Sequence, residues 1–315
     1  MDGGADDQHP GLTRILRRPD AARAIALLGD DLSGSDLTTA LLEIARRRVA
    51  AVSPLDVLAQ YERDRFVAPA TVDPRALLAM QLVALETVAP QFEAIATSPV
   101  APLGAHAAVA GVHQDRVITT IRRTEVAADP TNSLALEAAL RRRRLLSSDA
   151  RSTHAVRLAG VDRVVRAQQF GGPRSFAHFT LLGLVTAGRA TGSREFETAA
   201  FAEHVRMLCS ICLALGFTER RVHVTDFSGT HDHVLQATID ALAADDVIAL
   251  RWPERELGRG YYPSVCCKVS VVVGDEEIEV GDGGMVDWTQ RLLGNRKERL
   301  MISGLGIERL ASVAR

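Results

Sequence analysis

Near the end of this 315-residue chain, two closely spaced glycines separate a short apolar segment from a helical pattern. Residues 300–303 have the pattern of a strand, Gly304 and Gly306 follow, and Glu308 and Arg309 open the helix. Glycines at a strand end let a ligand approach the backbone closely, and an arginine there can hold a phosphate with its rigid set of donors. Taken alone, the stretch is more simply an ordinary strand-to-helix junction, because short glycine motifs often match by chance.

The composition indicates a globular protein without the charge of a nucleic-acid binder. Hydrophobic residues make up 47% of the chain and charged residues 24%, and the formal net charge is −2. This balance allows a sizeable core but gives no overall positive field for nucleic acid. The acidic N-terminus lacks the apolar stretch of a secretory signal, and no segment has the roughly 18 apolar residues of a membrane span. The sequence therefore predicts a cytoplasmic protein without membrane contact.

The hydrophobic pattern predicts an α+β protein with an N-terminal helical extension over residues 1–72 and a larger core over residues 73–315. After a loose segment, residues 1–18, helices are expected to begin at Asp20, Asp36 and Pro54, the first two with acidic caps. In the core, helical and alternating patterns are interleaved, and this order fits an antiparallel sheet with helices packed on it.

Within the core, Asp73 and Asp129 each precede a proline and a helical pattern, so both are expected to cap helices. Four arginines at residues 141–144 are predicted to lie at the C-terminus of the second of these helices, where the helix dipole favours positive charge. Further helices are expected over residues 195–215 and 231–243. Strands are expected over residues 92–99, 117–122, 156–166, 179–185, 222–225, 266–273 and 277–280.

Six short stretches occur in a fixed order along this core. They are residues 92–99, ending in Pro99; Ala128-Asp-Pro-Thr131; residues 166–179; Arg259-Gly-Tyr-Tyr262; Gly281-Asp-Gly-Gly-Met-Val-Asp287; and residues 304–310. Together they resemble the class II aminoacyl-tRNA synthetases, in particular histidyl-tRNA synthetase and the ATP phosphoribosyltransferase regulatory subunit. The resemblance spans about residues 75–315. It implies a six-stranded antiparallel sheet that binds ATP with Mg²⁺, and a homodimer with Pro99 at its interface.

The resemblance also implies roles for individual residues around ATP. Arg166 would hold the α-phosphate, Arg259 would neutralise it during amino-acid attack, and Arg309 would meet the γ-phosphate, which makes these three the implied catalytic residues. Gln168 stands where the family usually has a glutamate that reads the adenine amino group, and its carbonyl can still accept that hydrogen bond. The full implied ATP site, in which His178 or Phe179 stacks on the base, is Arg166, Gln168, Arg174, His178, Phe179, Gly304, Gly306, Glu308 and Arg309.

The implied amino-acid pocket departs from the histidyl branch. That branch reads imidazole with a glutamine and a glutamate in the strand after residues 166–179, where this chain has Leu181 and Val185. Both share one strand face with Gly183, which would leave space between them, so we expect an apolar floor and a small or apolar amino acid rather than histidine. The alternative is that these residues are core and leave no pocket. The pocket as implied comprises Asp129, which would take the ammonium group, with Thr131, Leu181, Gly183, Val185, Tyr261, Tyr262, Gly283 and Gly284.

Two functions are compatible with these residues. In the first, the protein activates an amino acid with ATP and passes the acyl group to a non-tRNA acceptor, such as a carrier protein or a small molecule. In the second, it is a non-catalytic regulatory subunit of a partner enzyme. The sequence ends soon after residues 304–310 without an anticodon-binding domain, so tRNA is not an expected partner. A scaffold without any ligand is the least favoured alternative.

The four cysteines pose a separate question. Cys209 and Cys212 have zinc-like spacing, and Cys266 and Cys267 could complete a set of four thiolates. However, the first two fall within a helical pattern, and adjacent residues of a strand face opposite sides. We therefore predict four buried, apolar cysteines and no metal site.

Overall fold

The computed structural model describes residues 10–168 and 177–314, and these form two compact units. The first unit comprises the described residues up to Glu62 together with Thr120–Arg123. The second comprises Arg63–Thr119 and the described residues from Thr124 onward. The division thus follows residue 62, whereas the boundary drawn from the sequence follows residue 72.

The first unit is built of short helices. The helices expected from Asp20, Asp36 and Pro54 are present, but a further helix lies in the segment that we expected to be loose. The cap of α3 also differs from the prediction, because Ser33 Oγ, not Asp36, accepts the capping hydrogen bond, from the Asp36 amide at 3.1 Å. Asp20 has a left-handed backbone and makes no side-chain cap bond. The helices are α1 (Pro10–Leu16), α2 (Ala21–Ala26), a π-helical turn (Leu27–Asp31), α3 (Gly34–Val49) and α4 (Pro54–Arg63).

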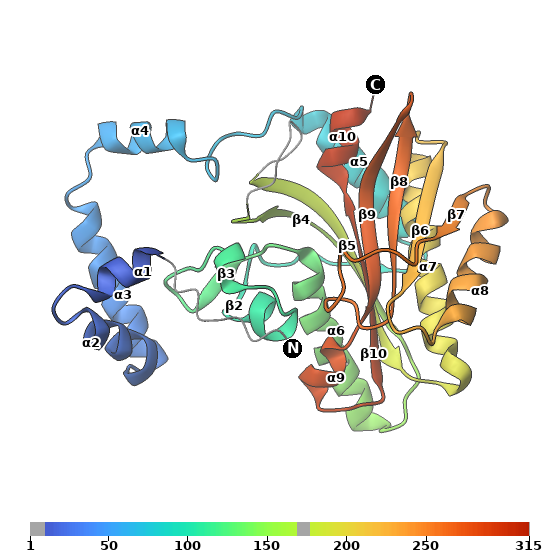
Figure 1. Cartoon of the computed structure of the whole chain (residues 1–315), viewed down its shortest axis with the longest axis horizontal. Helices are drawn as coiled ribbons and strands as arrows, with labels where there is room; N and C mark the ends of the chain where they lie inside the picture. The colour runs from blue at the N-terminus through green and yellow to red at the C-terminus, as the bar shows by residue number, and fades with distance from the viewer. Residues whose placement is uncertain (1–9, 169–176, 315) are drawn as a thin grey trace. The chain divides into compact units, whose positions relative to one another are not determined.

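One large sheet organises the second unit (Figure 1). Its strands are β1 (Glu93–Ala94), β4 (Val156–Val165), β5 (His178–Arg189), β6 (Arg220–Asp226), β7 (Ile248–Arg251), β8 (Val265–Val273), β9 (Glu276–Val286) and β10 (Glu298–Gly306). They follow the order β1-β4-β5-β10-β9-β8-β6-β7. The α+β class agrees with the prediction, but the sheet has eight strands rather than six. The difference lies at the two edges, because β1 and β7 pair in parallel with the outer members of an antiparallel six.

Helices cover both faces of this sheet (Figure 1). On one face, α5 (Pro74–Val88), α7 (Glu195–Ala214), α8 (Asp232–Ala243) and α10 (Ile307–Val313) enclose the larger apolar core. On the other face, α6 (Pro130–Ser148) and α9 (Trp288–Leu293) enclose a smaller one. No helix in the described part of the chain is both long and apolar enough to cross a membrane.

Two of these helices, α5 and α6, begin at the capping aspartates predicted from the sequence. The Asp73 side chain accepts a hydrogen bond from the Arg75 amide at 2.9 Å, and Asp129 does the same for the Thr131 amide at 2.9 Å. In each case a proline occupies the first helical turn, where its missing N–H is not needed. This capping places Asp129 at the end of α6 that faces the candidate site.

Two predicted strands differ from the structure. Residues 117–122 do not form a strand; the pairing occurs later, where β3 (Thr124–Val126) pairs with β2 (Val100–Pro102) in a separate two-stranded sheet. The strand expected over residues 92–99 is reduced to β1. A turn of 3-10 helix over Gln114–Arg116 leads into residues 117–122. The alternating pattern of these residues therefore reflects the burial of Val117 rather than strand pairing in a sheet.

The arginine cluster at residues 141–144 does not lie at the C-terminus of its helix, contrary to the prediction. Helix α6 continues to Ser148 beyond it, and Arg142 is fully buried. Arg142 donates to both carboxylate oxygens of Glu298, at 2.8 and 2.9 Å, and to the carbonyl oxygens of Ser152 and His154, at 3.0 and 2.6 Å. Arg142 therefore ties α6 to the first residue of β10, through a long-range pair that helix patterning does not reveal.

Candidate functional site

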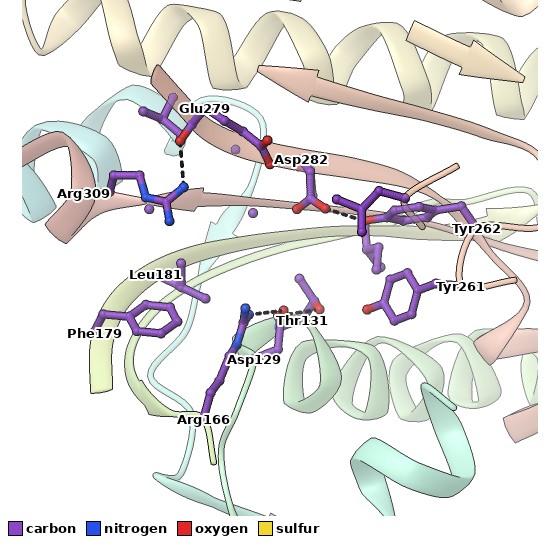
Figure 2. A pocket seen from close by; sticks show the side chains of 17 residues that line it. Asp129, Thr131, Arg166, Phe179, Leu181, Tyr261, Tyr262, Glu279, Asp282 and Arg309 are labelled. Atoms are coloured by element: carbon purple, nitrogen blue, oxygen red, sulfur yellow. Dashed lines mark hydrogen bonds and ion pairs between the residues drawn. The ribbon is translucent and has the colours of Figure 1, made fainter. Parts of the chain in front are cut away.

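A cavity of about 340 Å³ opens on the face of the sheet that carries α6, beside the start of that helix. Figure 2 shows side chains from several strands and from the α6 N-terminus pointing into it. The lining residues are Asp129, Thr131, Arg166, Phe179, Leu181, Leu257, Tyr261, Tyr262, Glu279, Val280, Gly281, Asp282, Ile302, Ser303, Gly304, Gly306 and Arg309. The cavity thus brings together residues from five of the six stretches noted in the sequence, all but the one that ends in Pro99.

Asp129 and Arg166 form an ion pair on one wall of the cavity. Asp129 Oδ1 accepts hydrogen bonds from the Thr131 amide at 2.9 Å and from the Thr131 hydroxyl at 2.7 Å. Its Oδ2 accepts one from Arg166 Nη2 at 3.2 Å. Arg166 Nε also donates to the Ala128 carbonyl oxygen at 2.9 Å. The helix cap therefore fixes the carboxylate, and the carboxylate in turn orients the guanidinium group.

Phe179 faces the cavity, whereas its neighbour His178 does not line it. The Arg166 guanidinium lies 5.1 Å from the centroid of the Phe179 ring. Arg163 Nε donates to His178 Nδ1 at 3.0 Å, and His178 Nε2 lies 2.6 Å from the Ala68 carbonyl oxygen. Of the two residues considered for stacking on a base, Phe179 is therefore the one placed to do so.

Arg309 extends into the same end of the cavity, on the wall opposite Phe179 (Figure 2). Its Nη1 donates to the Glu279 carbonyl oxygen at 2.8 Å. Gly304 and Gly306 line the cavity nearby. A Cβ on Gly306 would lie 3.3 Å from Arg309 Cβ, so the glycine leaves room for the arginine at the strand end.

Two tyrosines and an aspartate form the other end. The Tyr262 hydroxyl donates to Asp282 Oδ2 at 3.2 Å. The Tyr261 ring packs edge-on against that of Tyr262, with centroids 4.8 Å apart. A Cβ on Gly284 would lie 2.5 Å from Tyr262 Cδ1. Gly284 does not line the cavity itself, but it makes room for the Tyr262 ring, which does.

The surroundings raise the pKa values of the ionisable side chains at this end of the cavity. Asp282 remains exposed to solvent through the cavity. Partial loss of solvent on the cavity wall raises the pKa of its carboxyl group, the negative charges of Asp129 and Glu279 add to this rise, and the positive charges of Arg166 and Arg255 oppose it. Burial also raises the pKa of Tyr261 and of Tyr262 well above the ordinary value, so both remain neutral hydroxyls.

The predicted apolar floor around Gly183 is wrong. A Cβ on Gly183 would lie 2.8 Å from Pro130 Cγ and 3.3 Å from Leu134 Cδ1, so α6 already fills that space. Val185 is fully buried in the same layer. Of the three residues named for this floor, only Leu181 lines the cavity.

Arg259 is not among the residues that line the cavity. Its Nε pairs with Glu256 Oε2 at 2.8 Å, and its guanidinium lies 4.9 Å from the centroid of the Phe227 ring. The structure therefore brings together two of the three arginines assigned to phosphate contacts and leaves the third in a nearby surface segment.

The remaining predicted residues lie as follows. Glu308 is buried and accepts a hydrogen bond from the Thr180 amide at 3.0 Å, away from the cavity lining. A Cβ on Gly283 would lie 2.5 Å from an atom of β10, so this glycine allows two strands to approach. Gln168 is exposed and does not line the cavity. Arg174 lies outside the described residues.

The four cysteines are buried. Cys209 and Cys212 lie within α7, and Cys266 and Cys267 face the two different cores, as adjacent strand residues should. Burial raises the pKa of the Cys209 thiol to about 12 and that of Cys266 to about 11. Within residues 10–168 and 177–314, no group of three His, Cys, Asp or Glu side chains is placed to hold a metal ion.

Sequence reasoning missed Asp282 and Glu279. Both lie on β9, Asp282 inside the glycine-rich stretch and Glu279 just before it. A signal for Asp282 was present, because residues two apart on a strand share a face, so that Asp282 had to lie on the same face as Gly284.

Comparisons with known proteins identify the fold class of this chain. No protein-family model matches the sequence, and no curated protein is similar to it in sequence. Solved structures are similar, however, and they include class II synthetase-like proteins. The fold of this chain is therefore class II synthetase-like, as its six stretches indicated.

Three of the similar structures are histidyl-type proteins. An ATP phosphoribosyltransferase regulatory subunit/histidyl-tRNA synthetase from Bacillus halodurans aligns with a TM-score of 0.60 and 13% identity, over 79% of this chain and 82% of that one. The apo histidyl-tRNA synthetase of S. aureus aligns with a TM-score of 0.57 and 12% identity, over 78% and 68%. A histidine–tRNA ligase subunit from Alicyclobacillus acidocaldarius aligns with a TM-score of 0.55 and 13% identity, over 78% and 94%.

Proposed function

We propose that this protein activates an amino acid with ATP and passes the acyl group to an acceptor other than tRNA. The observation that supports the activation step is the division of the cavity. One end presents Arg166, Arg309 and the Phe179 ring, and the other presents Asp129 beside two tyrosines. Guanidinium groups suit phosphates and an aromatic face suits a base, whereas a carboxylate suits an ammonium group.

In the proposed reaction, the carboxylate of the amino acid attacks the α-phosphorus of ATP, and pyrophosphate leaves. The carboxylate is already ionised at neutral pH, so the step needs no general base. Arg166 contacts both Asp129 and Phe179 and therefore stands between the two ends, where the new bond would form. Its charge would stabilise the transition state by positioning and electrostatics.

The residues present also fit the magnesium ion that ATP carries. Mg²⁺ usually keeps several waters and binds one or two carboxylates together with substrate phosphates. Glu279 supplies such a carboxylate on the cavity wall; its backbone carbonyl contacts Arg309, and its side chain pairs with Lys268. When bound, the ion would neutralise charge on the departing pyrophosphate.

A non-catalytic regulatory subunit is the second candidate, and one observation favours it. Arg259, which the resemblance would assign to the α-phosphate, pairs with Glu256 outside the cavity lining. A chain that only regulates a partner enzyme would not need that arginine in place.

Exchange of labelled pyrophosphate into ATP separates the two functions. We expect the purified chain alone, with Mg²⁺, to catalyse this exchange when a suitable amino acid is added and not without one. Absence of exchange across all amino acids, in a preparation that still binds ATP, would favour the regulatory function instead.

We also propose the homodimer that the resemblance implies, with α5 and Pro99 at its interface. Leu78 and Leu82 lie one turn apart on this helix, and 66% and 56% of their surfaces are exposed. We expect light scattering at micromolar concentration to give the mass of a dimer, and Leu78→Glu with Leu82→Glu to give a monomer, because charges do not pack in an apolar interface. Ala76→Glu, on the opposite side of the helix, should leave the dimer intact. A monomeric wild-type protein would contradict the proposal.

A further inference from the structure

The three carboxylates that line the cavity differ in their partners. Asp129 pairs with Arg166, and Glu279 pairs with Lys268. Asp282, by contrast, has a single hydrogen bond among the described residues, donated by the neutral hydroxyl of Tyr262 at 3.2 Å. One carboxylate therefore faces the cavity without an ion pair among the described residues, although the charges of Arg166 and Arg255 lie close enough to act on it.

This arrangement leaves unused capacity for hydrogen bonding. The Tyr262 bond occupies Asp282 Oδ2, so Oδ1 remains able to accept, and so does the hydroxyl oxygen of Tyr262 itself. Tyr261 lies beside both, and Figure 2 shows its hydroxyl directed into the cavity. Asp282 and Asp129 lie close enough for their charges to interact, yet they belong to different walls of the cavity.

A lone carboxylate in such a place favours one class of ligand. Asp282 is exposed to solvent through the cavity, and a ligand that fills the cavity would remove this water. A carboxylate that loses its water is unfavourable unless the ligand brings a cation or a strong donor to it. An ammonium group brings three donors and a guanidinium group five, and both keep their charge at neutral pH. An imidazole, with a pKa of about 6.5, is mostly neutral there and supplies much less charge.

We propose that the amino acid bound in this cavity has a side chain ending in an ammonium or guanidinium group, held by Asp282 with the Tyr262 hydroxyl. This inference rests on the proposed function, in which Asp129 holds the α-ammonium group. It replaces the apolar substrate expected from Leu181 and Val185. An apolar side chain would leave Asp282 desolvated and unpaired, so the site should reject it strongly.

Matched pairs of amino acids test the proposal in the pyrophosphate exchange assay. Lysine is compared with norleucine, and ornithine with norvaline, because each pair differs mainly in the terminal nitrogen. We expect the wild-type protein to prefer the basic member by about 30-fold or more in kcat/KM, the scale of a charged hydrogen bond. Asp282→Asn should reduce this preference at least about tenfold. Asp275→Asn, at an exposed turn residue between β8 and β9, should leave it unchanged.

Each outcome decides the proposal. Exchange only with histidine or with apolar amino acids would overturn it while the proposed activation stands. If no amino acid supports exchange, calorimetry with lysine, ornithine and arginine, in the presence of a non-hydrolysable ATP analogue, decides instead. Binding that Asp282→Asn weakens at least about tenfold would support the site without the activity, and no binding of any of the three would overturn it. If Asp282→Asn does not fold, the wild-type preference within each pair decides.

Discussion

Arg142→Ala should destabilise the protein by about 3–5 kcal/mol, because it leaves the buried Glu298 carboxylate without its cationic partner. Both side chains have 0% exposed surface, and Arg142 also satisfies two backbone carbonyl oxygens that close the turn after α6. Urea unfolding monitored by circular dichroism would measure the loss. The matched control is Arg143→Ala, the next residue of the same helix, which is exposed and should change stability by no more than about 0.5 kcal/mol.

A double variant separates the loss of a partner from the loss of the pair. Arg142→Met with Glu298→Leu should recover much of the stability, because apolar residues of similar size often replace a buried ion pair without loss. If the single Arg142→Ala variant were as stable as wild type, the pair would not be the link between α6 and β10 that its geometry indicates.

Arg309→Ala should weaken ATP binding by roughly 10- to 150-fold, the loss expected for a charge-assisted hydrogen bond to phosphate. Arg309 lines the cavity and contacts protein through the Glu279 carbonyl oxygen, so its guanidinium group retains donors for a ligand. Calorimetry with Mg-ATP would measure the change. Arg296→Ala, an exposed arginine in the turn before β10, is the matched control and should bind ATP like wild type. Equal ATP affinity in the Arg309→Ala and wild-type proteins would show that Arg309 does not contact the bound ATP.

Local signals predicted much of the fold. Asp73 and Asp129 cap helices where the sequence placed them, and Gly216, with a positive φ of 90°, follows the end of α7. The misses concern interactions that depend on distant residues. The edge strands β1 and β7 are short and exist because a neighbouring strand offers free backbone groups.

The candidate site was only partly predictable for the same reason. The arginines and glycines near the strand ends carried recognisable patterns, and they do meet in one cavity. Which residues of β5 face open space depends instead on how α6 packs, since Pro130 and Leu134 cover Gly183 but not Leu181. The importance of Asp282 depends on Tyr262, a residue of another segment that donates a hydrogen bond to it.

Titration of Mg-ATP into the wild-type protein by calorimetry tests the central claim most directly. The proposed site predicts saturable binding of one nucleotide per chain, because one cavity combines Arg166, Phe179 and Arg309. No binding of Mg-ATP at millimolar concentration would contradict the proposal that this cavity is a nucleotide site.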